Sequence, residues 1–105
     1  MNIVISSSKA IKDWLKARVE IDFAYHNLNS IVFKMIDKED TNVFGMLSPS
    51  TVADFKHAIY FHIKLTRPKD LLGKPLNTFT LSDVESCKPE LLEIQAKTLD
   101  KWPVS

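Results

Sequence analysis

Residues 55–65 read FKHAIYFHIKL, and this stretch decides the fold that the sequence predicts. Its odd positions are apolar except for His57, and its even positions are mostly polar. Successive side chains of a strand point to opposite faces, so the pattern predicts one apolar face and one hydrated face. We therefore expect residues 58–66 to form the central strand of a sheet, with the inward positions Ile59, Phe61, Ile63 and Leu65.

Length and composition indicate one globular domain covering residues 1–105. The chain is 45% hydrophobic and 26% charged, which is too apolar for a disordered chain. The net charge of +1 gives no strong attraction for nucleic acid. The two glycines, Gly45 and Gly73, lie too far apart for a glycine-rich phosphate loop. We expect a cytoplasmic protein, because Cys87 has no cysteine to pair with and no stretch resembles a signal peptide or a membrane helix.

The N-terminal third predicts a short strand followed by a long helix. Ile3, Val4 and Ile5 form an apolar run suited to a strand, and the serines at 6–8 are candidate helix caps. Beyond them the apolar residues recur at steps of three and four as far as Leu28. This spacing predicts a helix over residues 9–28.

Two interpretations remain open for residues 29–47. In the first, residues 31–47 form a β-hairpin, because Asn29 and Ser30 are poor helix formers and the polar sequence DKEDT at 37–41 has hairpin-loop length. In the second, a continuous helix runs over residues 9–38 and the protein is all-α. At the other end, Pro89 and the apolar spacing beyond it predict a C-terminal helix. The favoured fold class is α+β, a small antiparallel sheet packed against a long N-terminal helix and a C-terminal helix.

The residues that could carry catalysis do not form a recognisable set. His57 and His62 are five positions apart, which places them on opposite faces of a strand, so they are not expected to bind one metal. Asp22 and His26 are four apart on the predicted helix, a spacing common in plain surface pairs. Cys87 is expected to be an inert thiol. We expect no metal and no cofactor, and the sequence favours a binding protein over an enzyme.

Charged residues are unevenly distributed and suggest a binding surface. Residues 64–74 carry four cations and one acid, whereas residues 83–93 carry four acids and one cation. Aromatic residues near both ends are of the type that anchors interfaces. The predicted partner-binding residues are Lys64, Arg67, Lys69, Lys74, Trp14 and Trp102.

These features favour a small intracellular regulatory or inhibitory protein that binds another protein. An inhibitor, immunity protein or antitoxin, of the kind that phages and mobile elements encode, would fit. One alternative is a nucleic-acid-binding module that uses the basic loop 64–74. A less favoured alternative is a small hydrolase or nuclease that uses histidine and carboxylate side chains. The sequence predicts no membrane association and leaves a homodimer open.

Overall fold

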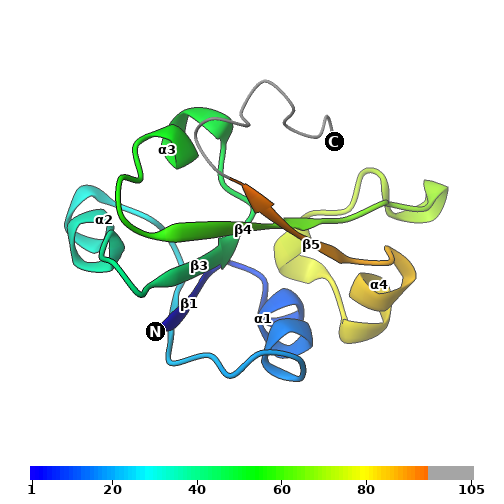
Figure 1. The fold of residues 1–105 in the computed structure, drawn as a ribbon. Helices are drawn as coiled ribbons and strands as arrows, with labels where there is room; N and C mark the ends of the chain where they lie inside the picture. Colours follow the sequence, from blue (N-terminus) through cyan, green and yellow to red (C-terminus); the bar gives the residue numbers. More distant parts are fainter. Residues whose placement is uncertain (95–105) are drawn as a thin grey trace.

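The computed structural model describes residues 1–94, which form a mixed five-stranded sheet with short helices on both faces (Figure 1). The strands are β1 (Asn2–Ile5), β2 (Phe23–Tyr25), β3 (Asn42–Gly45), β4 (Ile59–Lys64) and β5 (Glu90–Ile94). The α-helices are α1 (Lys9–Lys16), α2 (Ser30–Ile36), α3 (Pro49–Ala53) and α4 (Leu81–Ser86). Two 3-10 turns, η1 (Lys69–Leu71) and η2 (Leu76–Thr78), lie between β4 and α4. None of the described helices is long and apolar enough to cross a membrane.

The strand order in the sheet is β2-β1-β3-β4-β5. β1 is parallel to both β2 and β3, β3 is parallel to β4, and only the pairing of β4 with β5 is antiparallel. The four parallel strands therefore end along one edge of the sheet. We call this the carboxyl edge, where the last strand residues are Ile5, Tyr25, Gly45 and Lys64. The opposite side is the amino edge, where the same strands begin at Asn2, Phe23, Asn42 and Ile59.

Each face of the sheet is covered by its own hydrophobic core. On one face, strand residues pack with α1 and α4 in a buried cluster that includes Val4, Ile11, Trp14, Leu15, Phe44, Ile63 and Val84. On the other face, strand residues pack with α2 and α3 in a cluster that includes Ile3, Ile5, Ile36, Val43, Val52 and Tyr60. Helices on both faces are what parallel strands require, because each parallel connection must cross over the sheet.

The predicted long helix over residues 9–28 is wrong. Ser8 caps α1 as expected, since its hydroxyl accepts a hydrogen bond from the amide of Ile11. The helix ends at Lys16, and the chain then turns into the strand β2. The apolar residues of α1, of the loop after it and of β2 happen to recur at steps of three and four, which is the spacing of one long helix. The all-α alternative, with a continuous helix over residues 9–38, is wrong for the same reason.

The predicted hairpin over 31–47 is also wrong. Asn29 and Ser30 start α2 instead of preventing it, because the Asn29 side chain accepts a hydrogen bond from the amide of Val32. Residues with low helix propensity are favoured at helix caps for this reason. β3 does form at Asn42–Gly45, but it pairs in parallel with β1 and β4.

The strand predicted at 58–66 occurs as β4, but it is not central and it has no hydrated face. β3 occupies the middle of the sheet. Tyr60 and His62, on the face expected to be wet, are 1% and 8% exposed, whereas Ile59 is 44% exposed. Helices cover both faces of the sheet, so side chains on either face of β4 can be buried. The alternation of apolar and polar residues in this strand therefore does not predict which side chains are exposed.

The predicted C-terminal helix is contradicted where the chain is described. Lys88 has a positive φ of 49°, and residues 90–94 then form β5 beside β4. The remainder of that predicted helix, including Trp102, lies outside the described residues.

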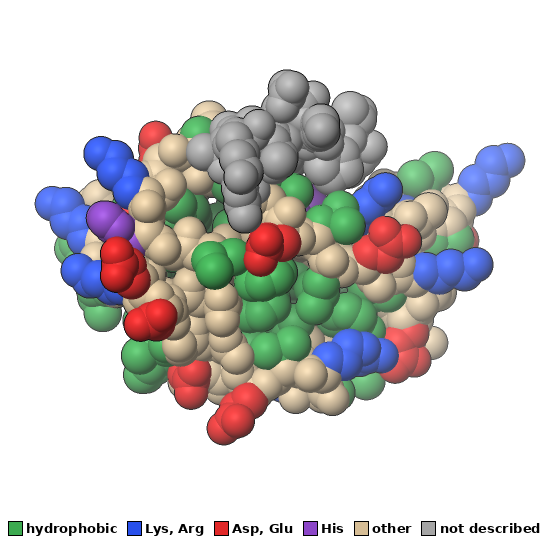
Figure 2. All heavy atoms as spheres, in the orientation of Figure 1, with side chains coloured by type: hydrophobic (Ala, Val, Ile, Leu, Met, Phe, Trp, Pro, Cys, Tyr) green, Lys and Arg blue, Asp and Glu red, His purple; other side chains and the backbone are tan. Residues whose placement is uncertain are grey.

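Polar groups tie the amino edge together. The Asp37 carboxylate accepts hydrogen bonds from the amides of Lys56, His57 and Ala58, at 3.1, 2.9 and 3.0 Å. The backbone amide of Asn2 donates to the Asp22 carboxylate at 2.8 Å. Figure 2 shows acidic side chains from the left to the lower border of this view, over the region where the strands begin.

Candidate functional site

The candidate site lies on the carboxyl edge, where the direction of the strand order reverses. From β1 the chain passes through α1 to β2 on one side, and from β2 through α2 to β3 on the other. At such a reversal the two connections diverge, and in open sheets of this kind ligands bind in the resulting crevice.

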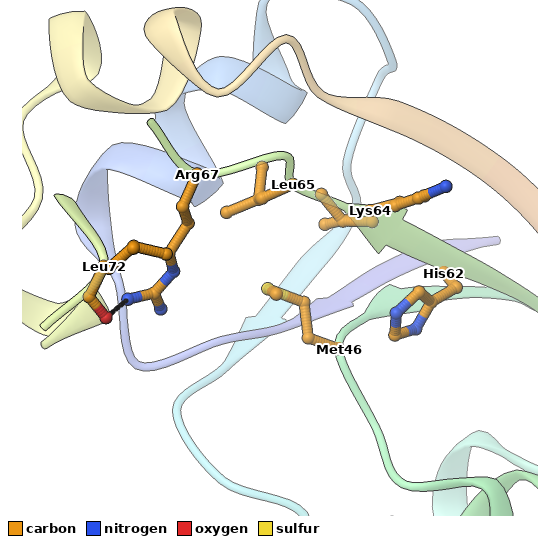
Figure 3. Close-up of a pocket in the computed structure, with 7 residues that line it drawn as sticks. Met46, His62, Lys64, Leu65, Arg67 and Leu72 are labelled. Carbon is orange, nitrogen blue, oxygen red and sulfur yellow. Dashed lines mark hydrogen bonds between the residues drawn. The ribbon is translucent and has the colours of Figure 1, made fainter. Parts of the chain in front are cut away.

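Two hollows open on this edge and share one residue, Met46. The first, of about 230 Å³, is lined by the loops after β1, β2 and β3, with Ser6, Ser7, His26, Asn27 and Leu47 among its residues. The second, of about 340 Å³, lies at the end of β4 and is lined by Met46, His62, Ile63, Lys64, Leu65, Arg67 and Leu72 (Figure 3). Because Met46 borders both hollows, they are neighbours, and we refer to the two together as the groove.

The serines after β1 shape the polar end of the groove. The Ser6 hydroxyl accepts a hydrogen bond from the amide of Ser8 at 3.0 Å, and Ser8 in turn caps α1. Ser7 is exposed between them. The amides of the first helical turn point toward this edge, and such amides attract negative charge.

A buried network fixes the other end of the groove. The Tyr60 hydroxyl donates to the carbonyl of Gly45 and accepts from the amide of Leu47, both at 2.8 Å. The same hydroxyl lies 2.9 Å from Nδ1 of His62. Since the hydroxyl hydrogen is directed at Gly45, Nδ1 of His62 must carry its own hydrogen and donate it to Tyr60.

Burial sets the protonation of this network. It raises the pKa of the Tyr60 hydroxyl, so that the phenol stays protonated. It lowers the pKa of His62 below 6.5, so the imidazole is neutral near pH 7. A neutral imidazole that is protonated on Nδ1 carries its lone pair on Nε2.

Gly45 is required where β3 meets this edge. A Cβ atom added at Gly45 would lie 2.9 Å from the carbonyl oxygen of Ile5 on the neighbouring strand. The backbones of β1 and β3 therefore approach closely beside the groove, and no side chain fits between them.

The predicted partner-binding cations have different roles in the structure. Nη1 of Arg67 donates to the carbonyls of Leu71, Leu72 and Lys74, and the guanidinium lies 5.1 Å from the centre of the Phe79 ring. Arg67 thus holds the loop 67–74 in shape. Lys74 forms an ion pair with Asp83 at 2.6 Å.

Lys64 and Lys69 are placed differently from these two. Lys69 is exposed in η1. Lys64 is partly exposed at the end of β4, and its chain extends away from Arg67 and Leu72 in Figure 3. A nucleic-acid surface formed by all four cations of 64–74 would compete with the internal contacts of Arg67 and Lys74.

The two predicted aromatic anchors do not meet. Trp14 is 5% exposed in the core beneath α1, with the Arg18 guanidinium 4.3 Å from its ring centre. Its role in this structure is packing. Trp102 lies outside the described residues.

The structure brings two of the three histidines to the same edge. His26 and His62 line the two neighbouring hollows, whereas His57 precedes β4 on the amino edge. Within residues 1–94 no group of three or more histidine, cysteine or acidic side chains is arranged to hold a metal ion. Cys87 is completely buried, and burial raises the pKa of its thiol.

No motif in the sequence marks Ser6, Ser7, Met46 or Leu47 as site residues. The serines are predicted as helix caps, and Met46 and Leu47 as part of the hairpin 31–47; the four become neighbours because β1 and β3 are adjacent and parallel. Their positions could have suggested this role, because each follows a short apolar run, and ligands bind beyond the ends of parallel strands.

The chain matches no family model, and no curated protein or solved structure matches it either. Function is therefore inferred from the geometry of the carboxyl edge.

Proposed function

We propose that the protein binds a small anionic molecule, such as a phosphate-bearing one, in the groove on the carboxyl edge. One observation carries this proposal. The first hollow is lined by hydroxyl, amide and imidazole groups and the second by an imidazole and two cations, and among the described residues neither lining includes a carboxylate. An anion entering the groove therefore meets no charge of its own sign.

The polar end of the groove suits the charged part of the ligand. Ser7 is exposed beside the start of α1, where amides and the helix dipole favour negative charge. His26 and Asn27 border the same hollow and add polar groups.

The second hollow contains Lys64, Arg67 and His62 and also offers apolar surface for an apolar part of the ligand. Met46 is 37% exposed and Leu72 is 63% exposed, and both line this hollow together with Leu65. Thioether and aliphatic side chains adapt to apolar and aromatic surfaces. The ligand class is thus an anionic molecule with an apolar portion.

The first experiment is a thermal melt of the full chain with increasing inorganic phosphate, compared between wild type and Ser7→Glu. Phosphate should raise the melting temperature of the wild type through binding to the folded state. The rise should be lost in Ser7→Glu, because the new carboxylate occupies the anion position. A glutamate near a helix start is itself compatible with folding.

Ser30→Glu is the matched control, because Ser30 is the exposed first residue of α2 and lies outside the groove. It should respond to phosphate as the wild type does. Equal loss in both variants, or an unchanged response in Ser7→Glu, would contradict the proposed site.

A second candidate function is the regulatory or inhibitory role expected from the sequence, exerted by binding another protein. The supporting observation is the loop 67–74, which Arg67 holds in shape and which exposes Leu72 beside Lys69. An exposed leucine on an ordered loop next to a cation is a suitable interface contact.

This candidate is tested by pull-down from source cells with wild type, Lys69→Glu and Leu72→Glu as bait. A specific partner should be retained by the wild type and lost by both variants, while Lys34→Glu on α2 should retain it. A partner that binds all four baits equally would exclude this loop as the interface.

A further inference from the structure

Exposed hydrophobic side chains occur on the outer strand β2 and on α2, the helix that follows it. Within residues 1–94, eight large hydrophobic side chains are exposed. Three of them belong to β2 and to α2, namely Phe23 at 52%, Ile31 at 70% and Met35 at 58%. A cluster of this kind at the border of a sheet indicates an interaction surface.

The sheet register places Phe23 on the same face as α2. Phe23 pairs with Ile3 and Tyr25 with Ile5, and both isoleucines belong to the core that α2 covers. Paired residues of adjacent strands point to the same face. On α2, Ile31 and Met35 are one turn apart and form an exposed stripe next to the buried Ile36.

The outer border of β2 offers backbone groups as well as apolar side chains. Phe23 and Tyr25 are in register with β1, and the carbonyl of Tyr25 accepts from the amide of Ser6. Backbone groups of successive strand residues point in opposite directions, so the amide and carbonyl of Ala24 point away from β1.

We propose that a second copy of this chain pairs with β2, antiparallel and centred on Ala24, to give a two-fold dimer with one continuous sheet. The two Ala24 residues would exchange amide–carbonyl hydrogen bonds across the axis. This goes beyond the proposed ligand binding and does not depend on it.

The side chains are self-complementary in this register, which argues for a second copy over an unrelated partner. Phe23 faces Tyr25 of the second copy, an aromatic cross-strand pair of a favourable type.

The helices complete the match. A two-fold axis perpendicular to the sheet places both copies of α2 on the same face, beside the axis. Ile31 and Met35 of one copy then meet those of the other. A three-residue strand pairing is marginal alone, and this apolar contact provides the additional burial.

Sedimentation equilibrium of the full chain over a range of concentrations tests the proposal. The wild type should associate to twice the chain mass. Ile31→Glu and Ala24→Pro should each raise the dissociation constant by about tenfold or more, since one buries a charge and the other removes the outward amide. Leu81→Glu, which changes a residue 44% exposed on α4, should dimerise like the wild type.

Symmetric cross-linking tests the register. A hydrogen-bonded antiparallel pair has Cα atoms about 5.5 Å apart, within the range of roughly 4.4–6.8 Å that a disulfide spans. Ala24→Cys should therefore form a covalent dimer under mild oxidation, and Leu81→Cys should not. The native Cys87 is fully buried and should stay unreacted.

Two results would overturn the proposal. One is a wild type that remains monomeric at every concentration, which would leave the β2 surface to a different protein. The other is a dimer that persists in both Ile31→Glu and Ala24→Pro, which would place the contact elsewhere. Circular dichroism of each variant verifies that the fold is retained.

Discussion

At the amino edge of the sheet one carboxylate, Asp37, accepts hydrogen bonds from three consecutive amides, whereas at the carboxyl edge two hollows stay open. The amino edge is tied further by Asn2, whose side chain accepts from Asn42 and donates to the carbonyl of Glu20. Its polar groups are used within the protein. At the carboxyl edge, the hydroxyl of Tyr60 is the centre of a buried hydrogen-bond network, and serine and histidine side chains line the groove.

In this small domain, the edge available for binding is the one whose polar groups the fold does not need for its own stability. Loops that fasten strand starts hold the parallel sheet together, because no hairpin joins these strands. With that edge closed, the opposite edge can present polar groups to a ligand without weakening the fold.

The largest effect is expected at the amino edge. Asp37→Ala removes one acceptor that serves the amides of Lys56, His57 and Ala58, and should lower the free energy of unfolding by about 3 kcal/mol. Urea denaturation measures it. Glu39→Ala, at an exposed position of the same loop, should change stability little. Equal effects in both variants would show that Asp37 does not fasten this edge.

A smaller loss is expected at the carboxyl edge. Tyr60→Phe removes the hydroxyl that joins Gly45, Leu47 and His62, and should cost about 2 kcal/mol in the same experiment. A variant as stable as the wild type would mean that this network contributes nothing to holding the edge.

Acid titration should separate the two edges. His62 has a pKa below 6.5 in the folded protein, so the unfolded chain takes up the proton first and stability falls as pH decreases through 6.5. Burial favours the protonated form of Asp37, but the hydrogen bonds from three backbone amides together outweigh it and lower the pKa below 3.8. Its contribution to stability is therefore present above that pH and is lost as pH falls through the lowered value.

The free energy of unfolding, measured from pH 7 to pH 2, should therefore depend less steeply on pH in each variant than in the wild type, in a different pH range for each variant. His62→Gln should lose the slope just below pH 6.5, and Asp37→Asn should lose part of the slope below pH 4. A His62→Gln profile parallel to that of the wild type would contradict the burial of a neutral imidazole.

The smallest effect is expected away from both edges. Cys87→Ala should leave phosphate binding unchanged, since the thiol is buried and its pKa is raised. A thiol reagent should modify the native protein slowly and the unfolded protein quickly. Loss of binding in Cys87→Ala with an unchanged melt would assign the thiol a role that its position does not suggest.

Local signals in the sequence predicted several strands and helix starts, but not the topology. The apolar run at Ile3–Ile5, the serine cap of α1 and the alternation around Tyr60 are properties of neighbouring residues. Which strands pair, and in which direction, depends on contacts between distant residues. Thus Asn42–Gly45 was placed in a hairpin although its partners are β1 and β4.

The candidate site was harder to predict for the same reason. Ser7, His26, Met46 and His62 lie far apart in the sequence and converge only through parallel pairing. The basic surface over residues 64–74 was predicted from the number of cations in that segment. That number does not show that Arg67 donates its hydrogen bonds to carbonyls of its own loop.

That use of Arg67 has a thermodynamic consequence for any partner of the loop 67–74. One guanidinium nitrogen restrains three carbonyls, so the loop is already ordered before an encounter. Association with Leu72 would then lose little conformational entropy, and its free energy would come mainly from the contact itself. Preorganisation of this kind lets a small exposed surface bind more tightly than its area suggests.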